Sequence, residues 1–352
     1  MSLRFYRLFS LLSAGTLLLV SLSGHAASFD CAKATSVTEK AICADEELSA
    51  LDEKLAVVWK KASGFNPVAM KSSQLQWLKF RDDCGAVFSC LSARYSMKLI
   101  ALERVAKNEE FPVVGTDQAG NRLEALIPET HEESTDADAR RCTADKRFCV
   151  QLLQEALIQI DYVGANPATY SFALPDLHLE GNSRTKVTLW SSVLRLAGDD
   201  GAILVGVEYT GFHDYLGGGS GARELQLFRV SRNETAFHVH EVLSVLIGLW
   251  MSSRTCYSEQ DVHDQLGACG DDHQFNASIG LDRTVKSGFP RFVYQTHAMN
   301  FPRKVSRPLR KQDLVYDVDP HCTYKRTFRF ENTTGTYVPD KPLPDCSDFG
   351  GP

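Results

Sequence analysis

The sequence has no excess of positive charge and no stripe of basic residues. It carries 38 Lys and Arg residues against 44 Asp and Glu residues, a formal net charge of -6 at pH 7. Proteins that bind nucleic acid present clustered Lys and Arg side chains to the phosphates. We therefore expect no nucleic-acid partner.

The sequence also lacks the common motifs of catalytic and cofactor sites. Residues 217–221 read GGGSG, without the Lys-Ser/Thr ending of a phosphate loop or the Gly-x-Ser-x-Gly frame of a serine nucleophile. We interpret this stretch as a flexible hairpin turn. His213, Asp214 and Tyr215 precede it, so a partner-binding loop stays open as an alternative. We predict no catalytic residue and no cofactor, because no motif pairs two carboxylates across a cleft.

Metal sites are not indicated either, because no cysteine pair has the Cys-x-x-Cys spacing of a zinc ligand set. His238 and His240 would share one face of a strand, which we interpret as surface. Acidic and His side chains also crowd around one cysteine loop, and we interpret them as solvating it: Asp261, His263, Asp271, Asp272 and His273. A metal site is the alternative for the two histidines, and a metal or partner site is the alternative for the cysteine loop. We predict no metal.

The long apolar run of this chain lies at its N-terminus. Leu8 to Leu22 follows Arg4 and Arg7 and precedes the small residues of Gly24-His25-Ala26. A membrane-spanning helix needs roughly 20 apolar residues, and this run is shorter and contains serines. We predict a signal peptide over residues 1–26, no stable membrane anchor after its cleavage, and a protein that is periplasmic or secreted by a bacterium.

Ten cysteines follow this segment, an even number that fits disulfides in an oxidising compartment. The last six fall as three neighbouring pairs, for which we expect sequential bonds: Cys142 with Cys149, Cys256 with Cys269, and Cys322 with Cys346. The first four allow three pairings. Because two expected helices run antiparallel, we favour Cys43 with Cys84 and Cys31 with Cys90.

Residues 28–110 carry the signals of a small helical bundle. Ser36 and Glu39 have the spacing of a capping box, and Asp45 can cap the next helix, which ends before Gly64. Apolar residues at helical spacing predict two further helices. The four expected helices are Val37–Cys43, Asp45 to Gly64 with both as caps, Ser73–Asp83 and Leu91–Val105. A bundle of this size commonly needs disulfides to be stable.

The bundle also carries a specific set of motifs: Phe29-Asp30-Cys31, Thr38-Glu39, Ile42-Cys43, Leu51-Asp52, Gln76-Trp77-Leu78, Arg81-Asp82 with Cys84, and Cys90-Leu91 with Tyr95. With these, residues 29–105 resemble the LprI-type lysozyme inhibitor N-terminal domain family. Trp59 departs from it, standing where Tyr usually ends the second helix. The resemblance implies an envelope protein that binds a lysozyme-like glycosidase. We expect the signature residues Trp77, Leu78, Arg81 and Asp82 to be structural, with Arg81 paired to Asp52 or Asp82.

Residues 111–140 are expected to form an acidic linker. Six carboxylates lie between Glu124 and Asp138 with no Lys or Arg among them: Glu124, Glu129, Glu132, Glu133, Asp136 and Asp138. Such a run is typical of a solvated linker. The alternative is that it attracts a basic partner over a distance, as many lysozymes are basic.

Residues 141–352 are predicted to form a β-rich domain, which resembles no family that we recognise. One helix is expected at Arg147–Ile158. Alternating or β-branched runs then predict nine strands: Tyr170–Leu179, Lys186–Leu196, Ala202–Tyr209, Glu224–Val230, Thr235–Ile247, Gln274–Leu281, Arg291–His297, Leu314–Val318 and Tyr324–Phe330. Turn signals between them favour an antiparallel sandwich or barrel.

The sequence thus predicts an α+β protein, with a disulfide-stapled helical module followed by an antiparallel β domain. The predicted function is that of an exported binding protein, which blocks a lysozyme or another peptidoglycan-cleaving enzyme. In the alternative interpretation, the β domain carries the activity by binding an envelope ligand or protein, and the helical module is structural. Binding retained by residues 140–352 alone would favour this alternative.

Overall fold

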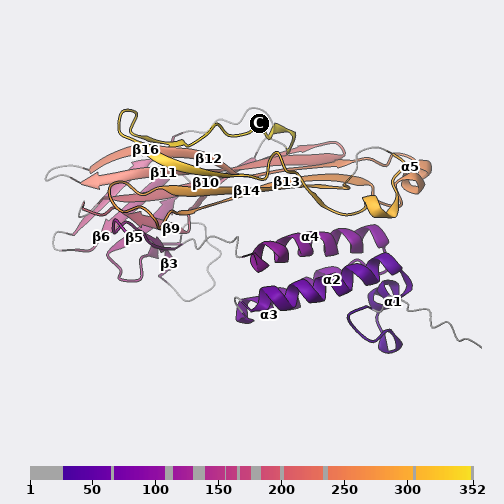
Figure 1. The fold of residues 1–352 in the computed structure, drawn as a ribbon. Helices are drawn as coiled ribbons and strands as arrows, with labels where there is room; N and C mark the ends of the chain where they lie inside the picture. The colour runs from indigo at the N-terminus through magenta and orange to yellow at the C-terminus, as the bar shows by residue number, and fades with distance from the viewer. Residues whose placement is uncertain are drawn as a thin grey trace, which may run out of the picture.

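A computed structural model describes residues 27–64, 67–107, 114–129, 139–154, 156–164, 167–175, 184–198, 202–232, 237–303 and 307–349. A helical module occupies residues 27–107, and the described residues that follow form a mainly antiparallel β region (Figure 1). The predicted α+β class is therefore confirmed. The expected signal peptide, residues 1–26, lies outside the described residues.

Four helices make up the module: α1 (Val37–Ala44), α2 (Glu46–Ser63), α3 (Pro67–Asp82) and α4 (Phe88–Ala106). The capping box is confirmed, because the Ser36 hydroxyl accepts from the Glu39 amide at 3.0 Å and the Glu39 carboxylate accepts from the Ser36 amide at 3.0 Å. Asp45 caps α2 as predicted. Helix α3 starts earlier than expected, at Pro67, a residue type favoured in the first helical turn.

The expected pairing of the first four cysteines is wrong. The bonds join Cys31 to Cys43 and Cys84 to Cys90, with Cα atoms 5.8 and 5.6 Å apart. Each bond closes a local turn beside a helix end. The start of α1 does lie near the end of α3, since the Thr38 hydroxyl donates to the Asp82 carbonyl at 3.3 Å. The three sequential bonds, Cys142–Cys149, Cys256–Cys269 and Cys322–Cys346, are confirmed.

Every described strand pairing is antiparallel. The larger sheet contains β1 (Gly115–Thr116), β2 (Arg122–Ala125), β8 (Arg184–Leu189), β9 (Ser192–Arg195), β10 (Ile203–Tyr215), β11 (Gly218–Arg232), β12 (Phe237–Arg254), β13 (Gly270–Leu281), β14 (Phe292–Phe301), β15 (Asp317–Val318), β16 (Lys325–Glu331) and β17 (Thr336–Pro339). The smaller sheet contains β3 (Ile127–Pro128), β4 (Arg141–Cys142), β5 (Phe148–Leu153), β6 (Leu157–Tyr162) and β7 (Ala168–Ala173). A short helix, α5 (Glu259–Asp264), lies between β12 and β13.

Three sequence expectations fail in the β region. The helix expected at Arg147–Ile158 is the hairpin of β5 and β6, because its apolar residues alternate and face one core. The strand expected at Lys186–Leu196 is two strands, β8 and β9. The described part of the expected linker also contains strands β1 to β3, while residues 130–138 lie outside the described residues.

The two sheets pack face to face over an apolar core. Strand β10 is buried on both sides, with Ile203, Val205 and Val207 directed at the smaller sheet. The smaller sheet supplies Val150, Leu152, Ile158 and Ile160 to this core. Leu204 faces a second core that also takes in residues of β11 to β14. A strand that is buried on both faces is expected to be apolar at consecutive positions, and β10 is such a strand.

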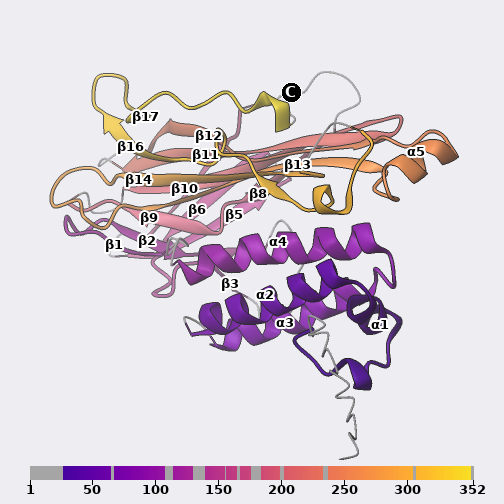
Figure 2. The same cartoon turned by 45° about the vertical axis from the view of Figure 1, so that its right-hand side comes forward.

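Helix α4 docks the helical module onto the β region, and both ribbon views place it nearest the sheet (Figure 2). Phe88, Ala93, Met97 and Ile100 of α4 pack on an apolar cluster of β14 and the loops beside it. The buried Ser96 hydroxyl accepts a hydrogen bond from the Tyr316 amide at 2.9 Å. These contacts leave α1, α2 and α3 on the side away from the sheet (Figure 2).

Candidate functional site

The signature residues form a buried polar network inside the helical module. Trp77 is 8% exposed and meets the Tyr95 ring edge-on, with ring centroids 5.2 Å apart. The Tyr95 hydroxyl donates to Asp52 at 2.7 Å, and the Ser28 amide donates to the other oxygen of Asp52 at 2.7 Å. Burial and the nearby Asp52 carboxylate raise the pKa of Tyr95, so its hydroxyl stays a donor.

Arg81 completes this network. It is 7% exposed, donates to Asp82 at 2.7 and 2.9 Å, and lies 5.8 Å from the Trp77 ring. Arg81 therefore contacts Asp82, which is one of the two partners expected for it. Leu78 packs against the same core. These contacts agree with a structural role for the signature residues. The exposed surface of the module is therefore formed mainly by other residues.

Several large hydrophobic side chains remain exposed on the module: Val37, Val57, Leu75, Phe80 and Val87. Leu75 and Phe80 belong to α3, and the Arg94 guanidinium lies 5.9 Å from the Phe80 ring. Exposed apolar residues on an otherwise charged helix surface are typical of protein contacts when they gather. Helix α3 thus carries two of these five exposed hydrophobic side chains of the module.

His213, Asp214 and Tyr215, the residues named as a speculative partner site, lie at the exposed end of β10. The tight turn that follows consists of Leu216 and Gly217, whereas Gly218 to Gly221 belong to strand β11. The expected flexible glycine turn is therefore mostly strand. An aromatic ring explains one of the glycines, because a Cβ atom at Gly221 would overlap the Trp250 ring.

The histidine and carboxylate groups singled out in the sequence do not converge. His238 and His240 lie on β12, away from the loop closed by Cys256 and Cys269. In that loop and just after it, Asp271 pairs with Arg307 and His273 contacts Asn300 at 2.7 Å. In the described part of the chain, no group of three or more His, Cys, Asp or Glu residues could hold a metal ion.

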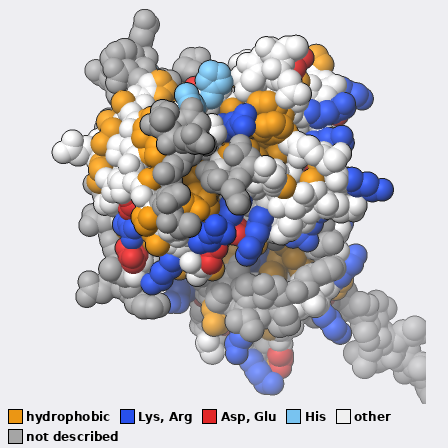
Figure 3. Space-filling model, turned by 90° about the vertical axis from the view of Figure 1, so that its left-hand side faces the viewer, with side chains coloured by type: hydrophobic (Ala, Val, Ile, Leu, Met, Phe, Trp, Pro, Cys, Tyr) orange, Lys and Arg blue, Asp and Glu red, His pale blue; other side chains and the backbone are white. Residues whose placement is uncertain are grey.

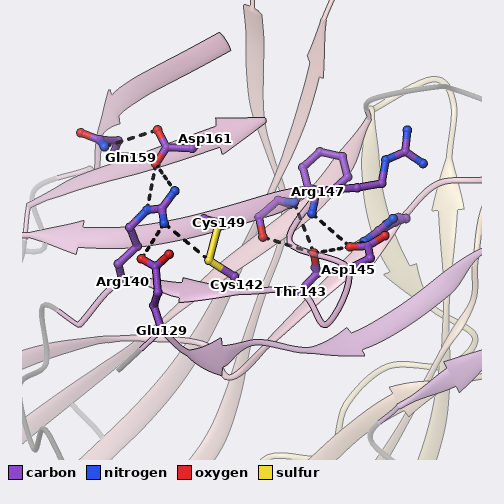
Figure 4. Close-up of a disulfide and its surroundings, with 11 residues drawn as sticks. Glu129, Arg140, Cys142, Thr143, Asp145, Arg147, Cys149, Gln159 and Asp161 are labelled. Atoms are coloured by element: carbon purple, nitrogen blue, oxygen red, sulfur yellow. Dashed lines mark hydrogen bonds and ion pairs between the residues drawn. A yellow bond between two sulfur atoms is a disulfide. The ribbon is translucent and has the colours of Figure 1, made fainter. Parts of the chain in front are cut away.

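Two carboxylates of the expected acidic linker, Glu124 and Glu129, are held in ion pairs, and Figure 4 shows that of Glu129. Arg140, beside the Cys142–Cys149 bond, lies 2.6 Å from Glu129 and 2.8 Å from Asp161. Glu124 pairs with Arg195 at 3.0 Å, and its side chain is 10% exposed. The other four carboxylates, Glu132, Glu133, Asp136 and Asp138, lie outside the described residues, so attraction of a basic partner by them stays a prediction.

Comparison with known proteins concerns the helical module. Residues 31–126 match the model of the family described as Lysozyme inhibitor LprI. This match confirms the resemblance seen in the sequence and its position in the N-terminal part of the chain. The match continues past the helices to Leu126 and so includes β1 and β2. We refer to residues 27–107 as the LprI-like module.

Individual relatives are distant. Proteins named "Lipoprotein LprI" from Mycobacterium bovis and Mycobacterium tuberculosis are 27% identical over 79 residues, which is 21% of this chain and 40% of each relative. The chain thus spans well under half the length of the curated relatives it matches. No solved structure matches it.

The five disulfides and the family match together indicate an extracellular or envelope protein. No helix in the described ranges is both long and apolar enough to cross a membrane. The matched family is described by inhibition and not by a catalytic activity, which agrees with a module that is not an enzyme.

Proposed function

We propose that the protein binds a lysozyme or another peptidoglycan-cleaving glycosidase and blocks its activity, in the periplasm or outside the cell. The family match over the LprI-like module carries this proposal. The buried network of Asp52, Trp77 and Tyr95 supports it, since the signature is built into a folded and disulfide-bonded core. We divide the chain into the signal peptide, this module, and the β region that follows.

The docked position of α4 narrows the surface available for binding. Its apolar face is covered by Met299, Phe301 and Tyr316, so a partner meets the module from the side of α1 to α3. Leu75 and Phe80 are 57% and 48% exposed there. Truncation of a buried apolar anchor at an interface typically costs more than about 1 kcal/mol of binding free energy.

Biolayer interferometry with an immobilised basic c-type lysozyme tests this proposal. The protein from Ala27 onward is expected to bind, and the doubly substituted variant L75E/F80E is expected to bind at least about tenfold more weakly. The matched control is L343E, because Leu343 is 40% exposed and lies in the C-terminal segment of the β region. Absence of binding by the unsubstituted protein at micromolar concentration would contradict the proposal.

A further inference from the structure

A cluster of exposed apolar side chains lies at one end of the β region, outside the LprI-like module. It is formed by Phe212, Tyr215, Leu216, Tyr257, Val262 and Leu266, which we name the β tip. Leu216 is 105% exposed and Tyr257 is 75% exposed. Single exposed apolar residues are ordinary on protein surfaces, whereas a contiguous group marks a contact site.

Backbone and ring contacts hold the hairpin half of the β tip in place. The Tyr215 hydroxyl donates to the Ser252 carbonyl at 3.1 Å, and the Arg254 amide donates to the Gly217 carbonyl at 2.6 Å. Gly217 has φ +89°, a conformation that glycine adopts without strain. The turn therefore presents Leu216 outward on a braced support.

The loop half of the β tip is braced as well. The Cys256–Cys269 bond closes the loop, and the Tyr257 hydroxyl donates to the Arg254 carbonyl at 2.9 Å. A Cβ atom at Gly217 would lie 3.7 Å from the Tyr257 hydroxyl, so the two halves are neighbours. Because the backbone of the turn and the ring of Tyr257 are held before binding, a partner that covers them loses less conformational entropy.

The β tip and the α1 end of the LprI-like module lie at the same end of the molecule (Figures 1 and 2). The Leu309 amide bonds to the Asp264 carbonyl at 2.8 Å, at the end of α5. Two residues on, Lys311 pairs with Asp45 of the module and lies 4.8 Å from the Phe88 ring. One partner can therefore contact both regions.

The sequence stretch that forms the loop half of the β tip carries a net negative charge. Residues 254–266 contain one Arg and three carboxylates, Glu259, Asp261 and Asp264, a balance of 1 - 3 = -2 with His counted as neutral. Backbone hydrogen bonds from Tyr257 and Ser258 lower the pKa of Asp261, so it is ionised at neutral pH. The opposite end of the molecule differs, and Lys and Arg side chains stand out there among hydrophobic ones (Figure 3).

We propose that the β tip is a second contact surface for the positively charged glycosidase that the LprI-like module binds, with Leu216 and Tyr257 entering a recess of that enzyme. The inference rests on the proposed function for the identity of the partner. Its own support is the protruding apolar turn, which fits a concave site, and the acidic surroundings, which complement a basic surface.

The test is a comparison of variants of the protein from Ala27 onward on the immobilised basic c-type lysozyme. L216A/Y257A is expected to raise Kd at least about tenfold. E259Q/D264N is expected to slow association and flatten its salt dependence, because the charged rim acts over a distance. V318A is the matched control, since Val318 is 37% exposed and belongs to β15. Equal melting temperatures would show that all variants fold.

The outcomes separate the two proposals. If the unsubstituted protein binds and L216A/Y257A binds equally well, the β tip inference is overturned and the function of the module stands. If the unsubstituted protein does not bind, both are overturned. Sedimentation velocity of each variant alone tests for self-association. If the unsubstituted protein is a dimer that L216A/Y257A dissociates, and lysozyme binding is unchanged, the β tip is a self-association surface and the inference is overturned.

Discussion

Replacing Tyr95 by Phe removes one hydroxyl from the core of the LprI-like module. The Phe ring keeps the edge-on contact with Trp77, so the change removes the hydrogen bond with Asp52 together with the interaction of the hydroxyl with Arg81. Asp52 is 4% exposed and would lose one of its two described donors, with the Ser28 amide remaining. A hydrogen bond to a buried charged group is worth about 1.5–3 kcal/mol. We therefore expect Y95F to destabilise the module by about 2 kcal/mol.

Hydrogen–deuterium exchange read by mass spectrometry measures this locally, which matters because the β region can stay folded when the module opens. A loss of about 2 kcal/mol corresponds to roughly 30-fold faster exchange. That acceleration is expected in peptides from α2 and α4, with those from β11 unchanged. Y257F is the matched control, since its hydroxyl also donates to one acceptor but is exposed. Equal exchange in α2 and α4 of Y95F and the unsubstituted protein would refute the reasoning.

Two further predictions concern the β region and its junction with the module. Hydrogen bonding to Arg195 holds the pKa of Asp145 well below its usual value, so its stabilising contribution is present above about pH 4 and is lost as the pH falls further. In urea unfolding, D145N is thus expected to lower the midpoint at pH 7, by a difference that shrinks steadily as the pH falls below about 4; a constant difference would contradict this. S96A leaves the buried Tyr316 amide without its acceptor, a cost of about 1–3 kcal/mol, and is expected to accelerate exchange in residues 314–318. Unchanged exchange there would show that this bond does not hold α4 in place.

Features set by neighbouring residues could be predicted from the sequence. The capping box of Ser36 and Glu39 depends on two side chains three positions apart, and the structure has it as expected. The bonds of Cys31 and Cys84 could not be predicted in the same way, because they depend on where the backbone turns around α1 and α4. A short apolar run also fits a helix or a strand, which is why Arg147–Ile158 was misassigned.

The candidate contact surfaces were only partly predictable. Tyr215 stood out because a glycine run follows it. Tyr257 did not, because nothing local places the loop after Cys256 beside Gly217. Trp77 and Arg81 were recognised as a signature, and their helical spacing correctly suggested core positions. Buried and exposed positions within a helix can thus be predicted from the sequence. The position of the β tip cannot, because it depends on two segments that are distant in the sequence.

The most direct test of the account is the muramidase activity of a basic c-type lysozyme, titrated with the oxidised protein from Ala27 onward and repeated after reduction of its disulfides. The account predicts inhibition that saturates at a fixed molar ratio. It also predicts that reduction abolishes this inhibition, because the Cys31–Cys43 and Cys84–Cys90 bonds staple the module. Full lysozyme activity at micromolar concentrations of the oxidised protein would contradict the central claim.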